Sequence, residues 1–260
     1  MPDPCLFCGS GIATNEHVVS HWVAKRLREV SPPELGAPTP IAANATRSYV
    51  SKLVEIKVRA PCRTCNSNFF NDLEDPCRPF LAEAITDRSA TIDADAKRAI
   101  ATYAYKTALL LTLNAIPRKQ WPRSVVEQCA LLYRNRRAPV GVRVWLGRFD
   151  LRDSFPDMVH GGRLSELQVR REGRLYRGTQ FIFTFGYLLF LVAFWEGPAP
   201  DDFIVEKERL APEGLIYVWP AFIQLATWPP SISVSYAMLN ELSYWNAGDW
   251  LGPVSSLPAP

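Results

Sequence analysis

Four of the six cysteines in the chain stand in two Cys-x-x-Cys pairs, Cys5 with Cys8 and Cys62 with Cys65. The two-residue spacing curls the backbone so that both sulfurs of a pair can face one point, and two pairs can close a tetrahedral thiolate shell around Zn²⁺. Buried thiols or a redox pair are the alternatives, and no thioredoxin-like βαβ pattern surrounds either pair. The spacing therefore predicts a structural zinc site, with the long segment between the pairs folded as an insertion.

Two of the three histidines, His17 and His21, lie between these cysteine pairs. A neutral histidine can accept a proton near physiological pH, which makes His17 a candidate general base. The spacing from His17 to His21 could also bind a metal on one helix face, but a partly buried helix residue beside Trp22 is the preferred prediction for His21. The third histidine, His160, is predicted to be a loop residue without a function.

The residues around the cysteine pairs resemble a known family. Glu16 and His17 stand together in "EHVV", and Asn66 directly follows the second cysteine pair in "CRTCN". In the wider frame of "CLFCG", "EHVVSHW", "CRTCNSNFFNDLE" and "ATYAYKTALLL", the chain resembles the HNH endonucleases, and among them a branch of bacterial and prophage proteins. The part that carries these motifs covers about residues 5–75.

This resemblance implies a ββα-metal core, with an acid–histidine pair at the end of one strand and an asparagine on the following helix. It implies that His17 activates a water for the hydrolysis of a DNA phosphodiester. Glu16 and the amide oxygen of Asn66 would hold Mg²⁺ or Mn²⁺, a hard ion that stabilises the leaving oxygen. Asn44 is a candidate for the middle asparagine of the motif, with a loop-tip asparagine as the alternative. Glu74 in "NDLE" matches the family frame and is a candidate for supporting the residues that bind the metal. The alternative is that Glu74 lies on a solvated helix face.

Two other functions remain open. The chain could be a zinc-knuckle protein that binds nucleic acid, or an adaptor, and keeps the HNH scaffold without cleaving. It could also be a toxin-like or defence effector whose second domain senses a ligand or partner. A water-sized gap between His17 and an ion held by Glu16 and Asn66 would favour catalysis. A buried or turned-away His17 would favour the binding protein.

The composition and the charge distribution limit these choices. With 48% hydrophobic and 21% charged residues, the chain is typical of globular proteins and is neither disordered nor fibrous. Residues 89–177 carry 17 Lys and Arg against 8 Asp and Glu, whereas residues 178–260 carry 2 against 8. The basic middle could neutralise DNA phosphates, and a solvated face balanced by the acidic last third is the alternative. The candidate DNA-binding residues are Arg134, Arg136, Arg137, Arg170 and Arg171.

No signal peptide is expected, because Asp3, Cys5 and Cys8 precede any apolar run, and this pattern favours a reducing, cytoplasmic setting. The longest apolar run, Phe181–Trp195, has 15 residues, whereas a membrane-spanning helix needs about 20. Buried strands are therefore predicted there, and no membrane association is expected.

The helices and strands that must position these residues are predicted to form an α+β fold. Residues 1–90 are predicted to form a zinc-stapled ββα-metal module, residues 91–252 an accessory α+β domain with two helices and an antiparallel sheet, and residues 253–260 a flexible tail. Residues 31–40, rich in proline, are predicted to be an exposed connector. Cys77 and Cys129 lie in apolar helical surroundings and are predicted to be inert core thiols.

Hydrophobic periodicity, capping residues and prolines give the individual elements. Helices are predicted over 20–30, 93–116 and 123–135. A further helix is predicted from Cys62 past Leu73, with a break near Pro76 and Pro79. Strands are predicted over 54–59, 140–147, 179–185 and 187–194, with a tight turn or bulge at Gly186.

Overall fold

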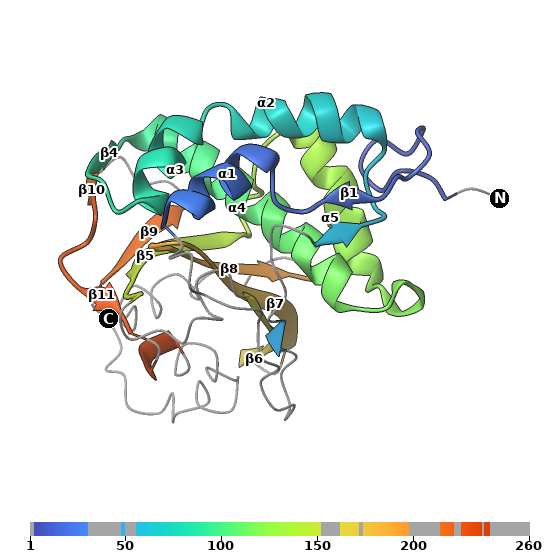
Figure 1. The fold of residues 1–260 in the computed structure, drawn as a ribbon. Helices are drawn as coiled ribbons and strands as arrows, with labels where there is room; N and C mark the ends of the chain where they lie inside the picture. The colour runs from blue at the N-terminus through green and yellow to red at the C-terminus, as the bar shows by residue number, and fades with distance from the viewer. Residues whose placement is uncertain are drawn as a thin grey trace.

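The computed structural model describes residues 3–30, 48–49, 56–151, 162–171, 174–197, 214–220, 225–235 and 237–239. The predicted α+β class is confirmed, because helices cover one face of a largely antiparallel sheet (Figure 1). The predicted connector 31–40, Asn44, His160 and the tail 253–260 lie outside the described residues.

The main sheet has seven described strands, and its centre is the antiparallel series that was predicted from the apolar runs. One edge pair is parallel, which the sequence did not indicate. The order across the sheet is β11 (Ser233–Val234), β5 (Arg143–Phe149), β8 (Leu188–Trp195), β7 (Arg174–Phe185), β6 (Gly162–Arg171) and β2 (Ser48–Tyr49), with β9 (Leu215–Trp219) also paired to β5.

Both faces of this sheet are apolar. Along β8, Phe190 and Phe194 belong to the core on the helical side, whereas Leu191 and Trp195 belong to a second buried cluster on the opposite face. Because side chains alternate along a strand, burial on both faces requires a continuous apolar run. The run Phe181–Trp195 is thus formed by buried strands, as predicted, and no helix among the described residues is long and apolar enough to span a membrane.

A tight turn at Gly186 joins β7 to β8, as predicted. Its φ of +59° favours glycine, and a Cβ at this position would lie 2.5 Å from the backbone oxygen of Ile85. The turn therefore fits closely against the C-terminal end of a helix.

The helical layer is built around α4 (Ala94–Ala115), which is buried on most of its surface. Asp93 caps this helix by accepting a hydrogen bond of 2.7 Å from the backbone N–H of Ala96. The other helices of the described residues are α1 (His21–Val30), the π-helical turn η2 (Cys65–Phe69), α2 (Phe70–Glu74), α3 (Arg78–Ile85), the 3-10 turn η3 (Arg118–Gln120), α5 (Arg123–Asn135) and a short helical turn at 237–239.

Two short strand pairs complete the fold. β4 (Ala90–Ile92) pairs with β10 (Ala226–Trp228), and β1 (Glu16–His17) pairs antiparallel with β3 (Lys57–Val58). A strand was predicted over 54–59. Of these residues the structure describes 56–59, and the strand there is β3. Along the chain α1 and β2 lie between β1 and β3, and the helix that begins at Cys65 follows β3.

Buried residues on both sides of residue 90 form one core. The cluster includes Cys65 and Phe70 from the N-terminal part, Tyr103 from α4, and Phe190 from the sheet. The strand β2 also comes from the N-terminal part and pairs with β6 at the edge of the main sheet. The division into domains 1–90 and 91–252 stays a prediction.

A candidate zinc centre and the polar residues beside it

The four cysteines of the predicted zinc site lie together. The sulfur atoms of Cys5, Cys8, Cys62 and Cys65 all lie within 4.8 Å of one another, and the Cys8 and Cys62 sulfurs are 3.7 Å apart. Zn–S bonds of about 2.3 Å place neighbouring sulfurs of a tetrahedron about 3.8 Å apart. Four thiols at this separation are the donor set that a structural zinc ion takes, so the cluster fits Zn²⁺.

The backbone folds tightly around the sulfurs. The N–H of Cys62 points to the Cys5 sulfur at 3.2 Å, and the N–H of Cys65 points to the Cys62 sulfur at 3.4 Å. The N–H of Cys5 donates to the carbonyl of Gly11 at 2.6 Å, which closes the first loop. A Cβ on Gly11 would lie 2.6 Å from both Cβ and Sγ of Cys62, so only glycine lets the two loops approach this closely.

Burial and hydrogen bonding act differently on Cys5, Cys8 and Cys65. Burial raises the pKa of the Cys5 and Cys65 thiols. The less buried Cys8 is also subject to desolvation, but hydrogen bonds from the hydroxyl and N–H of Ser10 and from the N–H of Gly11 lower its pKa to about 6. Of these three thiols, Cys8 therefore most readily supplies a thiolate.

The other two cysteines take no part in this cluster. Cys77 and Cys129 are fully buried at 0% exposure, which confirms their placement in the core. Burial raises the pKa of both thiols above the usual range, so they stay protonated at neutral pH.

The four-cysteine cluster lies where the β1–β3 pair meets the start of the η2 helix. Ala13 forms a β-bridge with Cys62, and the N–H of Thr14 donates to the Pro61 carbonyl at 2.9 Å. Asn66 directly follows Cys65 on η2, and its N–H donates to the Cys62 carbonyl at 2.9 Å. The cysteine pairs thus set the distance between the strand that carries Glu16 and the helix that carries Asn66.

Glu16 and Asn66 are in direct contact. The Asn66 Nδ2 atom donates a hydrogen bond of 2.8 Å to Oε2 of Glu16, and the Thr14 hydroxyl donates one of 2.6 Å to Oε1. Both residues are half-buried. Thr14 was not predicted as part of this site, although its position two residues before Glu16 could have indicated it, because alternate strand residues share a face.

His17 lies beside this pair but does not contact it. Its side chain is exposed, and it makes none of the hydrogen bonds found in the described residues. In the β1–β3 register His17 is opposite Lys57, whereas Glu16 is opposite Val58. Neighbouring strand residues point to opposite faces, so the Glu16 and His17 side chains leave β1 in different directions. His21, expected to be partly buried, is instead exposed at the first position of α1.

Glu74 occupies a different position from the solvated helix face that was one prediction for it. It is buried, and it accepts hydrogen bonds from Lys106 Nζ at 2.5 Å and from the Trp22 indole at 3.0 Å. The Lys106 ammonium also lies 4.9 Å from the ring centroid of Tyr103. Glu74 therefore links α1, α2 and α4, and no hydrogen bond or ion pair described in the structure joins it to Glu16.

The predicted DNA-binding arginines fall in two places. Arg134, Arg136 and Arg137 are exposed at the C-terminal end of α5, but Arg136 also forms an ion pair of 2.8 Å with Asp72 on α2. Arg170 and Arg171 lie at the end of β6, where only the backbone is described. No described contact brings these arginines to Glu16 or Asn66.

Comparisons with protein-family models, with curated proteins and with solved structures found no match for this chain. The resemblance to HNH endonucleases therefore depends on the sequence motifs and on the geometry of the residues that carry them.

Proposed function

We propose that the protein is a metal-dependent endonuclease of the HNH type that hydrolyses phosphodiester bonds in DNA. The observation that supports this proposal is the hydrogen bond of 2.8 Å between Asn66 and Glu16, next to a four-cysteine cluster and one residue from His17. The order of β1, β3 and the following helix supports it as well.

The donor groups at this position suit a hard divalent ion. A carboxylate and an amide offer oxygen ligands, which Mg²⁺ and Mn²⁺ prefer, whereas the thiolate cluster suits Zn²⁺. Asn66 now directs its NH₂ group at Glu16, so turning the amide over would present its oxygen beside the carboxylate oxygen. A bound ion would supply positive charge for the leaving oxygen of the phosphodiester.

The side chains of the protein would supply the general base and orient the metal ligand. His17 is exposed and so can receive a proton from a water molecule at the surface. Thr14 orients the carboxylate of Glu16 through the hydrogen bond to Oε1. The zinc cluster would act only as a support, because all four thiols are directed at one point and none is left to bind a substrate.

A second candidate function is a nucleic-acid-binding or adaptor protein on the same scaffold without cleavage. The observation that favours it is the alternation along β1, which directs His17 away from the face that carries Glu16. The two candidates share the zinc cluster and differ in whether His17 and the Glu16–Asn66 pair act together on one phosphate.

The test is cleavage of supercoiled plasmid by the purified chain, with Mg²⁺ or Mn²⁺ titrated against a chelated control. Asn66→Ala should shift the dependence on metal to higher concentration, with partial recovery of the rate when the ion is in excess. Ser67→Ala, one residue further along η2 and exposed, is the matched control and should titrate like the parent. If the parent protein binds the plasmid but never cleaves it with either ion, the binding protein is the better explanation.

A further inference from the structure

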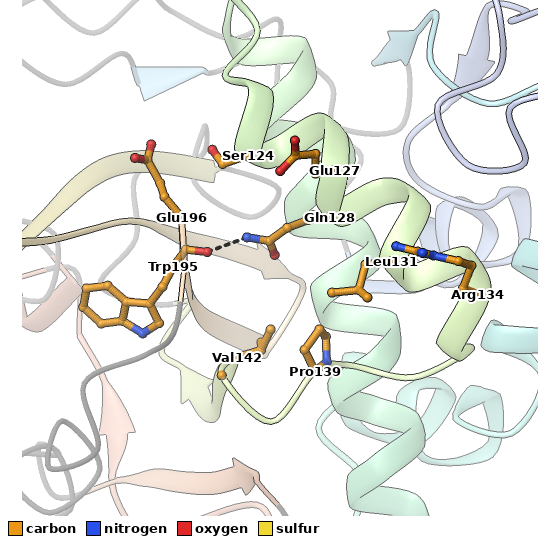
Figure 2. Close-up of a pocket in the computed structure, with 11 residues that line it drawn as sticks. Ser124, Glu127, Gln128, Leu131, Arg134, Pro139, Val142, Trp195 and Glu196 are labelled. Carbon is orange, nitrogen blue, oxygen red and sulfur yellow. Dashed lines mark hydrogen bonds between the residues drawn. The ribbon is translucent and has the colours of Figure 1, made fainter.

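A pocket of about 460 Å³ lies between α5, residues 139–142 and the end of β8 (Figure 2). Sites for small molecules have volumes of roughly 300–1,000 Å³, so this pocket is large enough for a compact ligand. Its apolar walls are formed by Leu131 of α5 and by Pro139 and Val142 of the segment that leads into β5.

The floor of the pocket is held in place by Gln128. Its Nε2 atom donates a hydrogen bond of 2.6 Å to the Trp195 carbonyl, which ties α5 to the end of β8, and its Oε1 atom accepts one from the Tyr105 hydroxyl. Both ends of the Gln128 amide are therefore engaged within the protein. The pocket is built on rigid elements, and its specificity must come from the other polar side chains.

These polar side chains form two groups of opposite charge. Glu127 and Glu196 direct their carboxylates to the same side of the pocket, with Ser124 between them, and Arg134 reaches back toward Leu131 from further along α5 (Figure 2). Glu127 and Arg134 are seven residues apart on one helix, which places them about 10.5 Å apart along its axis. Leu131 lies between them on the same helix face.

The charged groups are available to a ligand. Among the described residues neither Arg134 nor Glu196 makes an ion pair. Glu127 pairs only with Arg123 on the same helix, and their side chains are 62% and 93% exposed, so this pair is worth little and can be replaced.

A ligand that satisfies all of these groups has N–H donors at one end, an apolar body in the middle and an anion at the other end. A nucleotide has this arrangement, because the amino and imino groups of a base can donate to carboxylates while an arginine grips the phosphate. Guanine offers two adjacent N–H donors on its pairing edge, which suits a carboxylate best. Its flat ring system also suits the walls at Leu131, Pro139 and Val142.

We propose that this pocket binds a guanine nucleotide, with the base edge at Glu127 and Glu196 and the phosphate at Arg134. The nucleotide could be free or could be an unpaired guanine of a nucleic-acid strand, since both present the same base and phosphate. This inference does not depend on cleavage, because the pocket shares no residue with the Glu16–Asn66 pair.

The test is a calorimetric measurement of the equilibrium binding of guanosine monophosphate to the full chain. Guanosine tests the phosphate contact, and inosine monophosphate, which lacks the amino group, tests the base contact. Each should bind about fivefold more weakly than guanosine monophosphate, since contacts at exposed charges have this size. A five-nucleotide single strand with one central guanine, compared with the free nucleotide, shows which source the pocket prefers.

Variants separate the two ends of the pocket. Arg134→Gln should weaken guanosine monophosphate about fivefold and leave guanosine unchanged, whereas Glu196→Gln should weaken both. Arg88→Gln and Glu83→Gln, an exposed ion pair on another part of the surface, are the matched controls. The proposal is overturned if guanosine monophosphate shows no saturable binding up to about 10 mM, a limit for weak ligands. It is also overturned if inosine monophosphate binds equally well, or if Arg134→Gln leaves the affinity for guanosine monophosphate unchanged.

Discussion

Replacing Lys106 by methionine should destabilise the protein strongly at neutral pH. The side chains of Lys106 and Glu74 are 2% and 4% exposed, and they form an ion pair of 2.5 Å between α2 and α4. Removing one member of a buried pair leaves the other charge without compensation and costs about 3–5 kcal/mol. Methionine has nearly the volume of lysine, so the loss comes from the charge and not from a cavity.

The loss of stability in Lys106→Met should depend on pH, because it depends on the ionisation of Glu74. In the parent protein burial opposes ionisation of Glu74, but the Lys106 charge and the hydrogen bonds from Lys106 and Trp22 hold its pKa below the ordinary value. Its contribution is therefore fully present above the pKa of the unfolded chain, about 4.3, and is lost as the pH falls through the lower folded value. Without Lys106 the burial of Glu74 is no longer opposed by a positive charge, and the Trp22 hydrogen bond alone does not compensate for it, so the protonated acid is favoured. The deficit of Lys106→Met should thus shrink between pH 7 and pH 5.

Urea denaturation at pH 7 and pH 5, with the zinc content held equal, measures this directly. Arg98→Met is the matched control, because Arg98 lies on the same helix but pairs with Asp95 at the surface, with side chains 57% and 82% exposed. Its cost should be below about 1 kcal/mol. The combined change of Glu74→Leu with Lys106→Met should restore much of the stability. A loss below about 1 kcal/mol for Lys106→Met at pH 7 would refute the assigned role of this pair.

Three further predictions concern the zinc cluster and the arginines of α5. Cys62→Ser should lower the zinc content measured by elemental analysis and unfold the N-terminal part, whereas Cys129→Ser should keep its zinc; equal zinc in both would contradict the assigned ligands. Gly11→Ala should lower the stability by about 1–3 kcal/mol in thermal denaturation, because its Cβ would meet Cys62 at 2.6 Å, and an unchanged midpoint would show that the loops can separate at no cost. Reversing the charges at the end of α5 should reduce the slope of log affinity for DNA against log salt by about 1.8, because Arg136 is already paired with Asp72, whereas Arg134 and Arg137 form no ion pair with the described part of the chain. An unchanged slope would show that Arg134, Arg136 and Arg137 belong to an ordinary solvated surface.

Much of the secondary structure could be predicted because its signals are local. The helix predicted over 93–116 is observed as Ala94–Ala115, and the one predicted over 123–135 is observed at the same residues. The two apolar strands and the turn at Gly186 follow from alternation and from a glycine with positive φ. These features depend on spacing and on capping residues, which the sequence contains in full.

The break predicted near Pro76 and Pro79 is observed, because α2 ends at Glu74 and α3 begins at Arg78, with Pro79 in its first turn, where proline is well tolerated. The errors arose where distant segments meet. The parallel pairing of β11 with β5 has no local signal, since its partners are far apart in the chain. The pair of Glu74 with Lys106 was missed for the same reason.

The candidate site was predicted in part. The cysteine spacing predicted the cluster, and the motifs predicted that Glu16 and Asn66 would be neighbours, which they are. The direction of His17 could not be read from the motif, because it depends on how β1 pairs with β3. The supporting hydrogen bond from Thr14 was also missed.

The most direct test of the proposed function is the rate at which His17→Ala nicks supercoiled plasmid, measured beside the parent at saturating Mn²⁺ with equal zinc content. His21→Ala, exposed on the following helix, is the control and should cleave at the parent rate. Loss of a general base costs about 100- to 10,000-fold, so His17→Ala should lose nearly all cleavage while its affinity for DNA is kept. Cleavage by His17→Ala at the parent rate would contradict the account.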